Sequence, residues 1–177
     1  MKKKIRSGTF ETNSSSMHSL IVENFSEKFN PHKTETSSLK KDENGNLHVR
    51  LGEYGWGIEI LDTQQKKLNY LVTSIVCYKY IDSQEDLEDD YNFGELSREI
   101  CEHAGAKGII VDNFDGEYYI DHDSNNGITN EFIGNVFIEY KKNGKFKEEE
   151  FSVSAVEVVF NSEIKICISN DNTSKRW

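Results

Sequence analysis

Residues 62–80 read DTQQKKLNYLVTSIVCYKY and carry the clearest helical pattern in the chain. Their apolar side chains recur at the 3.6-residue spacing that places them on one face of an α-helix: Leu68, Leu71, Val72, Ile75 and Val76. Asp62 is the expected N-cap of this helix, and Gln65, three residues later, is its expected capping-box partner. The stretch therefore predicts a long helix with one face buried in a core.

A second helix is expected over about residues 93–104, with Gly105 as its stop. Short apolar or alternating runs predict strands at residues 18–23, 47–51, 108–111, 117–123 and 164–168. The KNGK sequence at residues 142–145 predicts a hairpin turn, and its charged second arm is typical of an edge strand. Residues 151–160 fit either a helix or a strand. Because no regular strand–helix–strand repeat occurs, we predict a single α+β domain over residues 1–177, with a mixed or antiparallel sheet and two main helices.

The composition limits the classes of function. The 177 residues include 31 acidic and 21 basic side chains, for a formal net charge of −10. General nucleic-acid affinity is therefore not expected, because it needs surplus Lys and Arg to displace counterions. No apolar run approaches the ~18 residues of a membrane helix, and no apolar segment follows the basic start as in a signal peptide. We expect a cytoplasmic protein without membrane contact, whose cysteines, Cys77, Cys101 and Cys167, are reduced core residues.

The most unusual segment covers residues 6–19, RSGTFETNSSSMHS. It gathers hydroxyl groups directly before a predicted strand, and such a loop can present N–H and hydroxyl groups to a phosphate. The candidate substrate-binding residues are Arg6, Glu11, Asn13, Ser14, Ser15 and Ser16. His18, at the end of the segment, is a candidate catalytic residue. The alternative is an ordinary loop whose hydroxyls bond to its own backbone.

A second polar cluster, YYIDHDS, occupies residues 118–124. On a strand, Asp121 and Asp123 would share one face, and such a carboxylate pair can help to bind Mg²⁺. His122 could transfer a proton, with Asp121 as a further candidate catalytic residue that orients a histidine. The alternative is the polar end of a strand.

An acidic run extends over residues 82–90 and could imitate a phosphate backbone. Runs of this kind are more often solvated faces.

The pattern RxGxFETNSSSxHS at residues 6–19 resembles the opening of a protein family from phages and prophages of Gram-positive bacteria. Three further blocks are similar to that family: GEYGW at residues 52–56, YIDHxS at residues 119–124, and residues 160–172. Asp123 stands where the family pattern has a glutamine.

The resemblance implies a phage protein that acts in the cytoplasm of a bacterial host. Small acidic phage proteins often inhibit host defence, so our leading expectation is an anti-CRISPR protein whose partner is Cas9 or its guide RNA. It would act as a ribonuclease or phosphodiesterase through His18, His122 and Asp121, with Mg²⁺ as a candidate cofactor, or it would block a nucleic-acid groove with its acidic surface. The alternatives are a nucleotide-binding, transferase-like enzyme and a structural or accessory phage protein.

Overall fold

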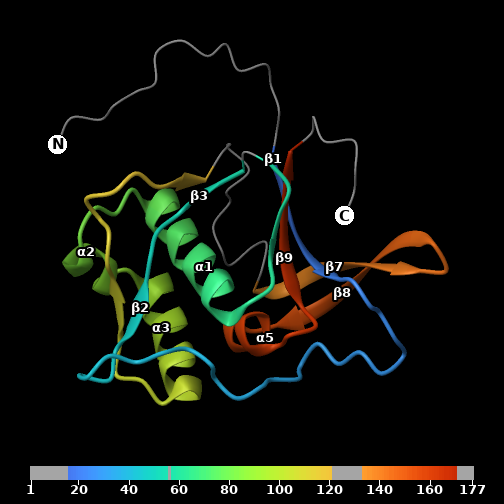
Figure 1. The fold of residues 1–177 in the computed structure, drawn as a ribbon, viewed down its shortest axis with the longest axis horizontal. Coiled ribbons are helices and arrows are strands. Elements are labelled where there is room, and N and C mark those ends of the chain that lie inside the picture. Colours follow the sequence, from blue (N-terminus) through green and yellow to red (C-terminus); the bar gives the residue numbers. More distant parts are fainter. Residues whose placement is uncertain (1–15, 56, 121–132, 171–177) are drawn as a thin grey trace, which may run out of the picture.

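The computed structural model describes residues 16–55, 57–120 and 133–170. Its largest layer is a five-stranded sheet in the order β4-β9-β1-β7-β8 (Figure 1). The strands are β1 (Ser16–Val22), β4 (Glu59–Leu61), β7 (Gly134–Lys142), β8 (Lys145–Val153) and β9 (Lys165–Asn170). β1 runs parallel to β7, and the other neighbours are antiparallel. The predicted α+β class and mixed sheet are thus confirmed.

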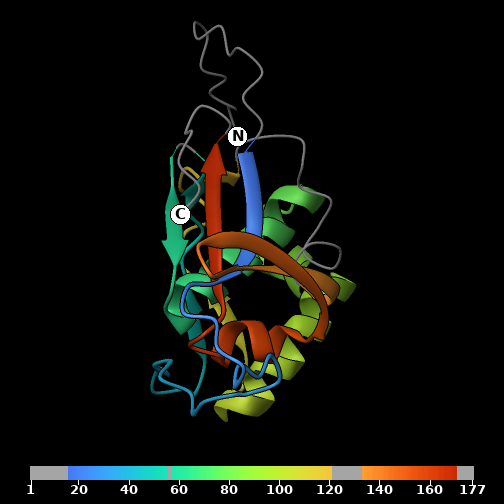
Figure 2. The ribbon, with the colours of Figure 1, turned by 90° about the vertical axis from the view of Figure 1, so that its right-hand side faces the viewer.

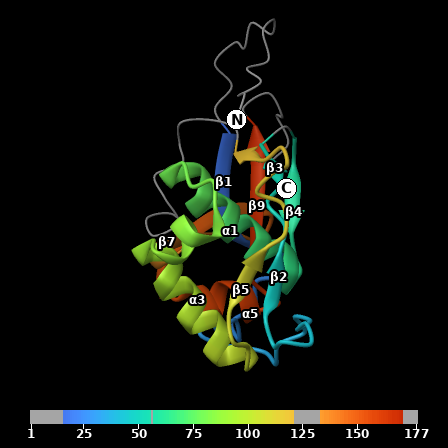
Figure 3. The ribbon, with the colours of Figure 1, turned by 90° about the vertical axis from the view of Figure 1, so that its left-hand side faces the viewer.

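Two small parallel strand pairs lie outside this sheet in the described part of the chain. β2 (Leu47–Val49) pairs with β5 (Ile109–Val111), and β3 (Glu53–Tyr54) pairs with β6 (Tyr119–Ile120). The long helix α1 (Gln64–Lys79) lies between these pairs and the five-stranded sheet (Figures 1 and 3). Strand β4 was not predicted, because three residues are too few for a clear alternation.

Helix α1 is buried around most of its circumference because it has neighbours on two sides. The predicted apolar face is confirmed, and four further residues are buried as well: Lys67, Tyr70, Thr73 and Ser74. The predicted N-cap was wrong by one residue. Thr63 is extended and its hydroxyl accepts a hydrogen bond from the Lys66 amide at 3.2 Å, whereas Asp62 pairs with the Lys66 ammonium at 3.0 Å.

The other helices complete the comparison with the sequence. Helix α3 (Tyr91–Ala104) ends at Gly105, whose φ of 62° suits glycine, as predicted. Helix α2 (Gln84–Glu88) lies in the acidic run, where no helix was predicted. Residues 151–160 contain both a strand and a helix. Strand β8 ends at Val153, and helix α5 (Ala155–Phe160) begins after its N-cap, Ser154, which forms a capping box with Glu157.

The β7–β8 hairpin has the predicted turn and register. Asn143 and Gly144 have φ values of 54° and 74°, as a type I′ turn requires. Ile138 lies opposite Glu149, and Tyr140 lies opposite Lys147. β8 is an edge strand of the sheet, as its charged sequence predicted.

Most of the buried apolar side chains form one core cluster that includes residues of both long helices and of the five-stranded sheet. All three cysteines are free thiols, as predicted. None of the helices in the described ranges is long and apolar enough to cross a membrane.

Candidate functional site

Two pairs of strands, β1–β9 and β3–β6, reach the same end of the molecule. Ser16 at the start of β1 pairs with Asn170 at the end of β9, and these strands lie side by side in Figure 2. β3 and β6 run parallel, with Tyr54 in register with Ile120, and lie at the same end of the fold (Figures 1 and 3). Each of these four strands overlaps one of the four sequence blocks of the resemblance: residues 6–19, 52–56, 119–124 and 160–172.

Tyr70 of α1 connects the two strand pairs. Its hydroxyl lies 2.6 Å from Nδ1 of His18 on β1, and the two rings meet edge to face with centroids 5.7 Å apart. The Tyr70 ring also meets the Tyr54 ring of β3 edge to face, with centroids 5.0 Å apart. Residues far apart in the sequence therefore meet around one buried tyrosine.

His18 is neutral at pH 7, because burial lowers its pKa to about 4. A neutral imidazole has one donor and one acceptor nitrogen, and Nδ1 is engaged with Tyr70. The other nitrogen, Nε2, is buried and has no hydrogen-bond partner in the described part of the chain. A buried polar atom left in this state costs about 1–3 kcal/mol, so its retention needs a reason.

Glu59 of β4 lies on the same face of the sheet as His18. Both residues are in register with Ile168 of the intervening strand, so they are about 10 Å apart across two strand spacings. Burial raises the pKa of Glu59. Burial, followed by the charge of Glu59, raises the pKa of Tyr54 to about 12. We call His18, Tyr54, Glu59 and Tyr70 the strand-end cluster.

Only part of the predicted site can be located. His18 is described with its side chain, and Ser16 with its backbone. The other predicted site residues lie outside the described residues: Arg6, Glu11, Asn13, Ser14, Ser15, Asp121, His122 and Asp123. Strand β6 ends at Ile120, the residue directly before Asp121, so the second polar cluster continues from a strand beside Tyr54. A meeting of His18 with His122 stays a prediction.

Magnesium binding by Asp121 and Asp123 also stays a prediction. In residues 16–55, 57–120 and 133–170, no three His, Cys, Asp or Glu side chains gather as metal ligands.

Sequence reasoning missed three members of the strand-end cluster. Tyr70 stands between the apolar residues of α1, where the helical pattern alone assigns it to no special role. Glu59 is a single charge in the short apolar run IEIL at residues 58–61, and this was the one available signal. Tyr54 lies in the GEYGW block at residues 52–56, where the two-residue strand β3 has no recognisable pattern.

The acidic run has mostly local partners. Asp86 and Ser83 exchange hydrogen bonds at the start of α2, and the Asp90 carboxylate caps α3 at the Phe93 amide. Glu88 accepts a hydrogen bond from the Gln84 side chain, while Leu87 is fully buried. These contacts favour the interpretation of the run as a solvated, helix-capping surface.

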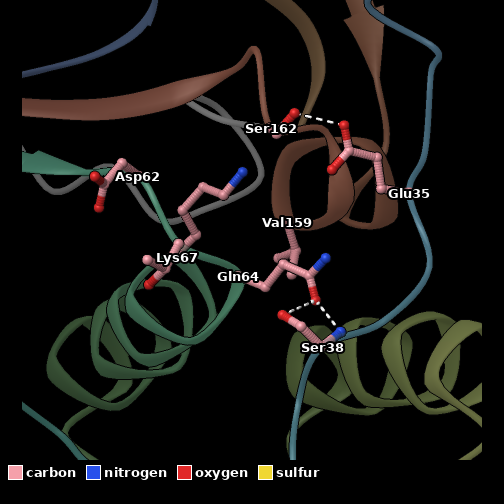
Figure 4. Close-up of a pocket in the computed structure, with 8 residues that line it drawn as sticks. Glu35, Ser38, Asp62, Gln64, Lys67, Val159 and Ser162 are labelled. Atoms are coloured by element: carbon pink, nitrogen blue, oxygen red, sulfur yellow. Dashed lines mark hydrogen bonds between the residues drawn. The ribbon is translucent and has the colours of Figure 1, made fainter.

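A pocket of about 220 Å³ opens beside the first turn of α1 (Figure 4). It is lined by Glu35, Ser38, Asp62, Thr63, Gln64, Lys67, Val159 and Ser162. Lys67 is only 1% exposed, and burial lowers its pKa to about 8. Its ammonium donates to the carbonyls of Asn161 and Ile164 at 2.8 and 3.0 Å. These bonds hold α1 against the turn after α5, so Lys67 has a structural role.

The strand-end cluster is therefore the better candidate site. It contains the neutral imidazole of His18, whose Nε2 has no described hydrogen-bond partner. It also contains the Glu59 carboxyl group, whose raised pKa favours proton transfer closer to neutral pH. Compared with known proteins, the chain matches no family model, no curated protein and no solved structure.

Proposed function

We propose that this chain is a phage counter-defence protein that binds and cleaves RNA at the strand-end cluster, with the guide RNA of a Cas9 system as substrate. The observation that carries the catalytic part is the open, buried Nε2 of His18 at the place where the four blocks meet. The phage and counter-defence part rests on the resemblance of those blocks. Both parts depend on the same residues.

The low pKa of His18 assigns it a role in the proposed chemistry. A group with a pKa of about 4 is almost entirely deprotonated at pH 7, so His18 accepts a proton from the attacking hydroxyl or orients the phosphate. The leaving oxygen needs a different donor. His122 fits that role because an unperturbed histidine has a pKa of about 6.5, and Glu59 is the described alternative.

The remaining polar residues hold the phosphate in this proposal. Arg6 and the hydroxyls of residues 14–16 supply donors to the oxygens on which charge develops. Ser16 is the first residue of β1, the strand that carries His18, and the other donors precede it in the sequence. Asp121 would orient His122, and a dependence on Mg²⁺ would assign Asp121 and Asp123 to the metal instead.

The test is incubation of purified protein with guide RNA, with and without Cas9 and with Mg²⁺ or a chelator, followed by a gel. We expect His18→Ala to reduce cleavage by roughly 10²–10⁴-fold. The matched control is His32→Ala, because the His32 side chain is largely exposed and pairs with Glu157 instead of the strand-end cluster. RNA that stays intact with the wild-type protein under all conditions would contradict the nuclease proposal.

A nucleotide-binding function without cleavage is the second candidate. It is favoured by the neutral state of His18, because a neutral imidazole can hold a base or phosphate without exchanging a proton. Calorimetric titration with nucleotides separates the two functions. Binding that His18→Ala weakens, together with intact RNA, would support this candidate.

A further inference from the structure

Strand β8 (Lys145–Val153) is an edge strand of the described sheet. It lies at the end of the strand order and pairs only with β7 among the described strands. All side chains from Lys145 to Glu150 are exposed. The hairpin also projects from the body of the molecule (Figure 1). A long edge of this kind is a template for another strand unless charges oppose the pairing.

The hairpin turn determines which backbone groups point outward. In a two-residue turn the flanking residues, here Lys142 and Lys145, exchange both backbone hydrogen bonds. Because bonding alternates along an antiparallel pair, Lys147 and Glu149 bond inward to β7. The backbone N–H and C=O groups of Phe146, Glu148, Glu150 and Ser152 then point away from β7, toward the outer edge.

The charges on this edge are complementary to a second copy of themselves. A two-fold axis at Glu148 would pair two β8 strands antiparallel, with Lys147 of each copy opposite Glu149 of the other. These positions are non-hydrogen-bonded pairs, where facing side chains are closest. Neither residue has an ion-pair partner in the described part of the chain, although Glu149 accepts a long hydrogen bond of 3.4 Å from the Tyr140 hydroxyl.

The alternative registers are less favourable. The chosen register has one like-charge contact, between the two Glu148 residues, at a wider hydrogen-bonded pair. An axis at Glu149 would place Glu148 opposite Glu150 twice and two Glu149 residues opposite each other. An axis at Lys147 would also place Lys145 opposite Glu149 twice, but it would put two lysines opposite each other at a close, non-hydrogen-bonded pair. It would also shorten the ladder, because the turn begins at Asn143.

We infer that β8 is a homodimerisation edge, at which two copies of the chain join their five-stranded sheets into one. The pairing is antiparallel and centred on Glu148. It adds about six backbone hydrogen bonds and two Lys147–Glu149 ion pairs across the two-fold axis. This surface is separate from the strand-end cluster and does not depend on the proposed RNA chemistry.

The test is sedimentation equilibrium of the full chain from about 1 to about 200 μM. We expect a concentration-dependent dimer that weakens with added salt. Lys147→Glu or Glu149→Lys alone should weaken association by about tenfold or more, because two attractive contacts become repulsive. The double change Lys147→Glu/Glu149→Lys should restore association to within about threefold of the wild type, because it restores opposite charges in this register.

Two further variants separate pairing at the β8 edge from effects of net charge and from unfolding. Glu148→Pro removes an outward N–H while leaving the bonds to β7, and should abolish the dimer with an unchanged circular dichroism spectrum. Lys40→Glu, on an exposed loop before β2, makes the same charge change elsewhere and should leave association unchanged. A wild-type chain that is monomeric at all concentrations would overturn the inference, as would a double change that fails to restore the dimer.

Discussion

Lys67 is a buried residue of α1, and the partly buried His18 of β1 contacts the same helix, but their hydrogen bonds differ. The Lys67 ammonium donates to two backbone carbonyls, whereas His18 has Tyr70 on one nitrogen and no described partner on the other. Burial lowers the pKa of both groups. A buried group with satisfied bonds stabilises the fold, and one with an open atom suggests a ligand. Four changes test this distinction, beginning with the largest expected effect.

Lys67→Met should lower the free energy of unfolding by about 3–5 kcal/mol. The substitution keeps most of the side-chain volume but leaves the Asn161 and Ile164 carbonyls buried without donors. Urea unfolding measures the effect. Lys66→Met is the control, because Lys66 is exposed and its partner in the described part of the chain is Asp62, in a surface ion pair. A Lys67→Met protein as stable as the wild type would show that these two bonds are dispensable.

Acid should destabilise the protein through His18. Its pKa is about 4 in the folded protein against 6.5 for the model group, so the unfolded state binds the proton first as the pH falls. Stability should therefore decrease by about 3 kcal/mol between pH 6.5 and pH 4. Urea unfolding across this range should show a smaller loss in His18→Leu than in the wild type. Equal losses in the two proteins would mean that His18 is protonated without penalty.

Tyr70→Phe should cost about 1–2 kcal/mol, because it removes the hydroxyl that satisfies Nδ1 of His18. The double variant with His18→Leu tests whether the two side chains act together. If they do, the double change will cost less than the sum of the single changes. Strictly additive losses in urea unfolding would contradict the coupling.

His48→Gln should have the smallest effect. His48 bridges Asp112 at 2.6 Å and Asp42 at 3.3 Å on an exposed surface, and the two carboxylates raise its pKa. A raised histidine pKa stabilises the folded state below pH 6.5, and this contribution is lost as the pH rises through the folded value. The melting temperature of His48→Gln should therefore fall slightly below the wild type at pH 6 and match it at pH 9. A difference that persists at pH 9 would assign His48 a role other than its charge.

Local patterns were sufficient for the parts of the fold that local physics determines. The apolar face of α1, the Gly105 stop and the KNGK hairpin depend on residues within a few positions of each other. The cap at Thr63 was missed because Asp62 fits the same rule one residue earlier. Helix α2 was missed because its single buried residue, Leu87, forms no periodic pattern.

The candidate site was only partly predictable for the opposite reason. His18 was identified from its residue type and its polar neighbourhood. Its neutral state and its contact with Tyr70 arise from packing between residues 52 positions apart, which no local pattern reports. Glu59 joins the same face only because β4 pairs with β9.

The position of β1 in the sheet has a consequence for biosynthesis. Its two neighbours, β7 and β9, begin at Gly134 and Lys165, so the strand has no pairing partner until late in translation. At about 5–20 residues per second, β1 waits on the order of ten seconds after it is made. During that time its apolar residues, Leu20, Ile21 and Val22, are available to chaperones or to aggregation. Folding is therefore expected to be largely post-translational and slow, as is typical of sheets closed by distant segments.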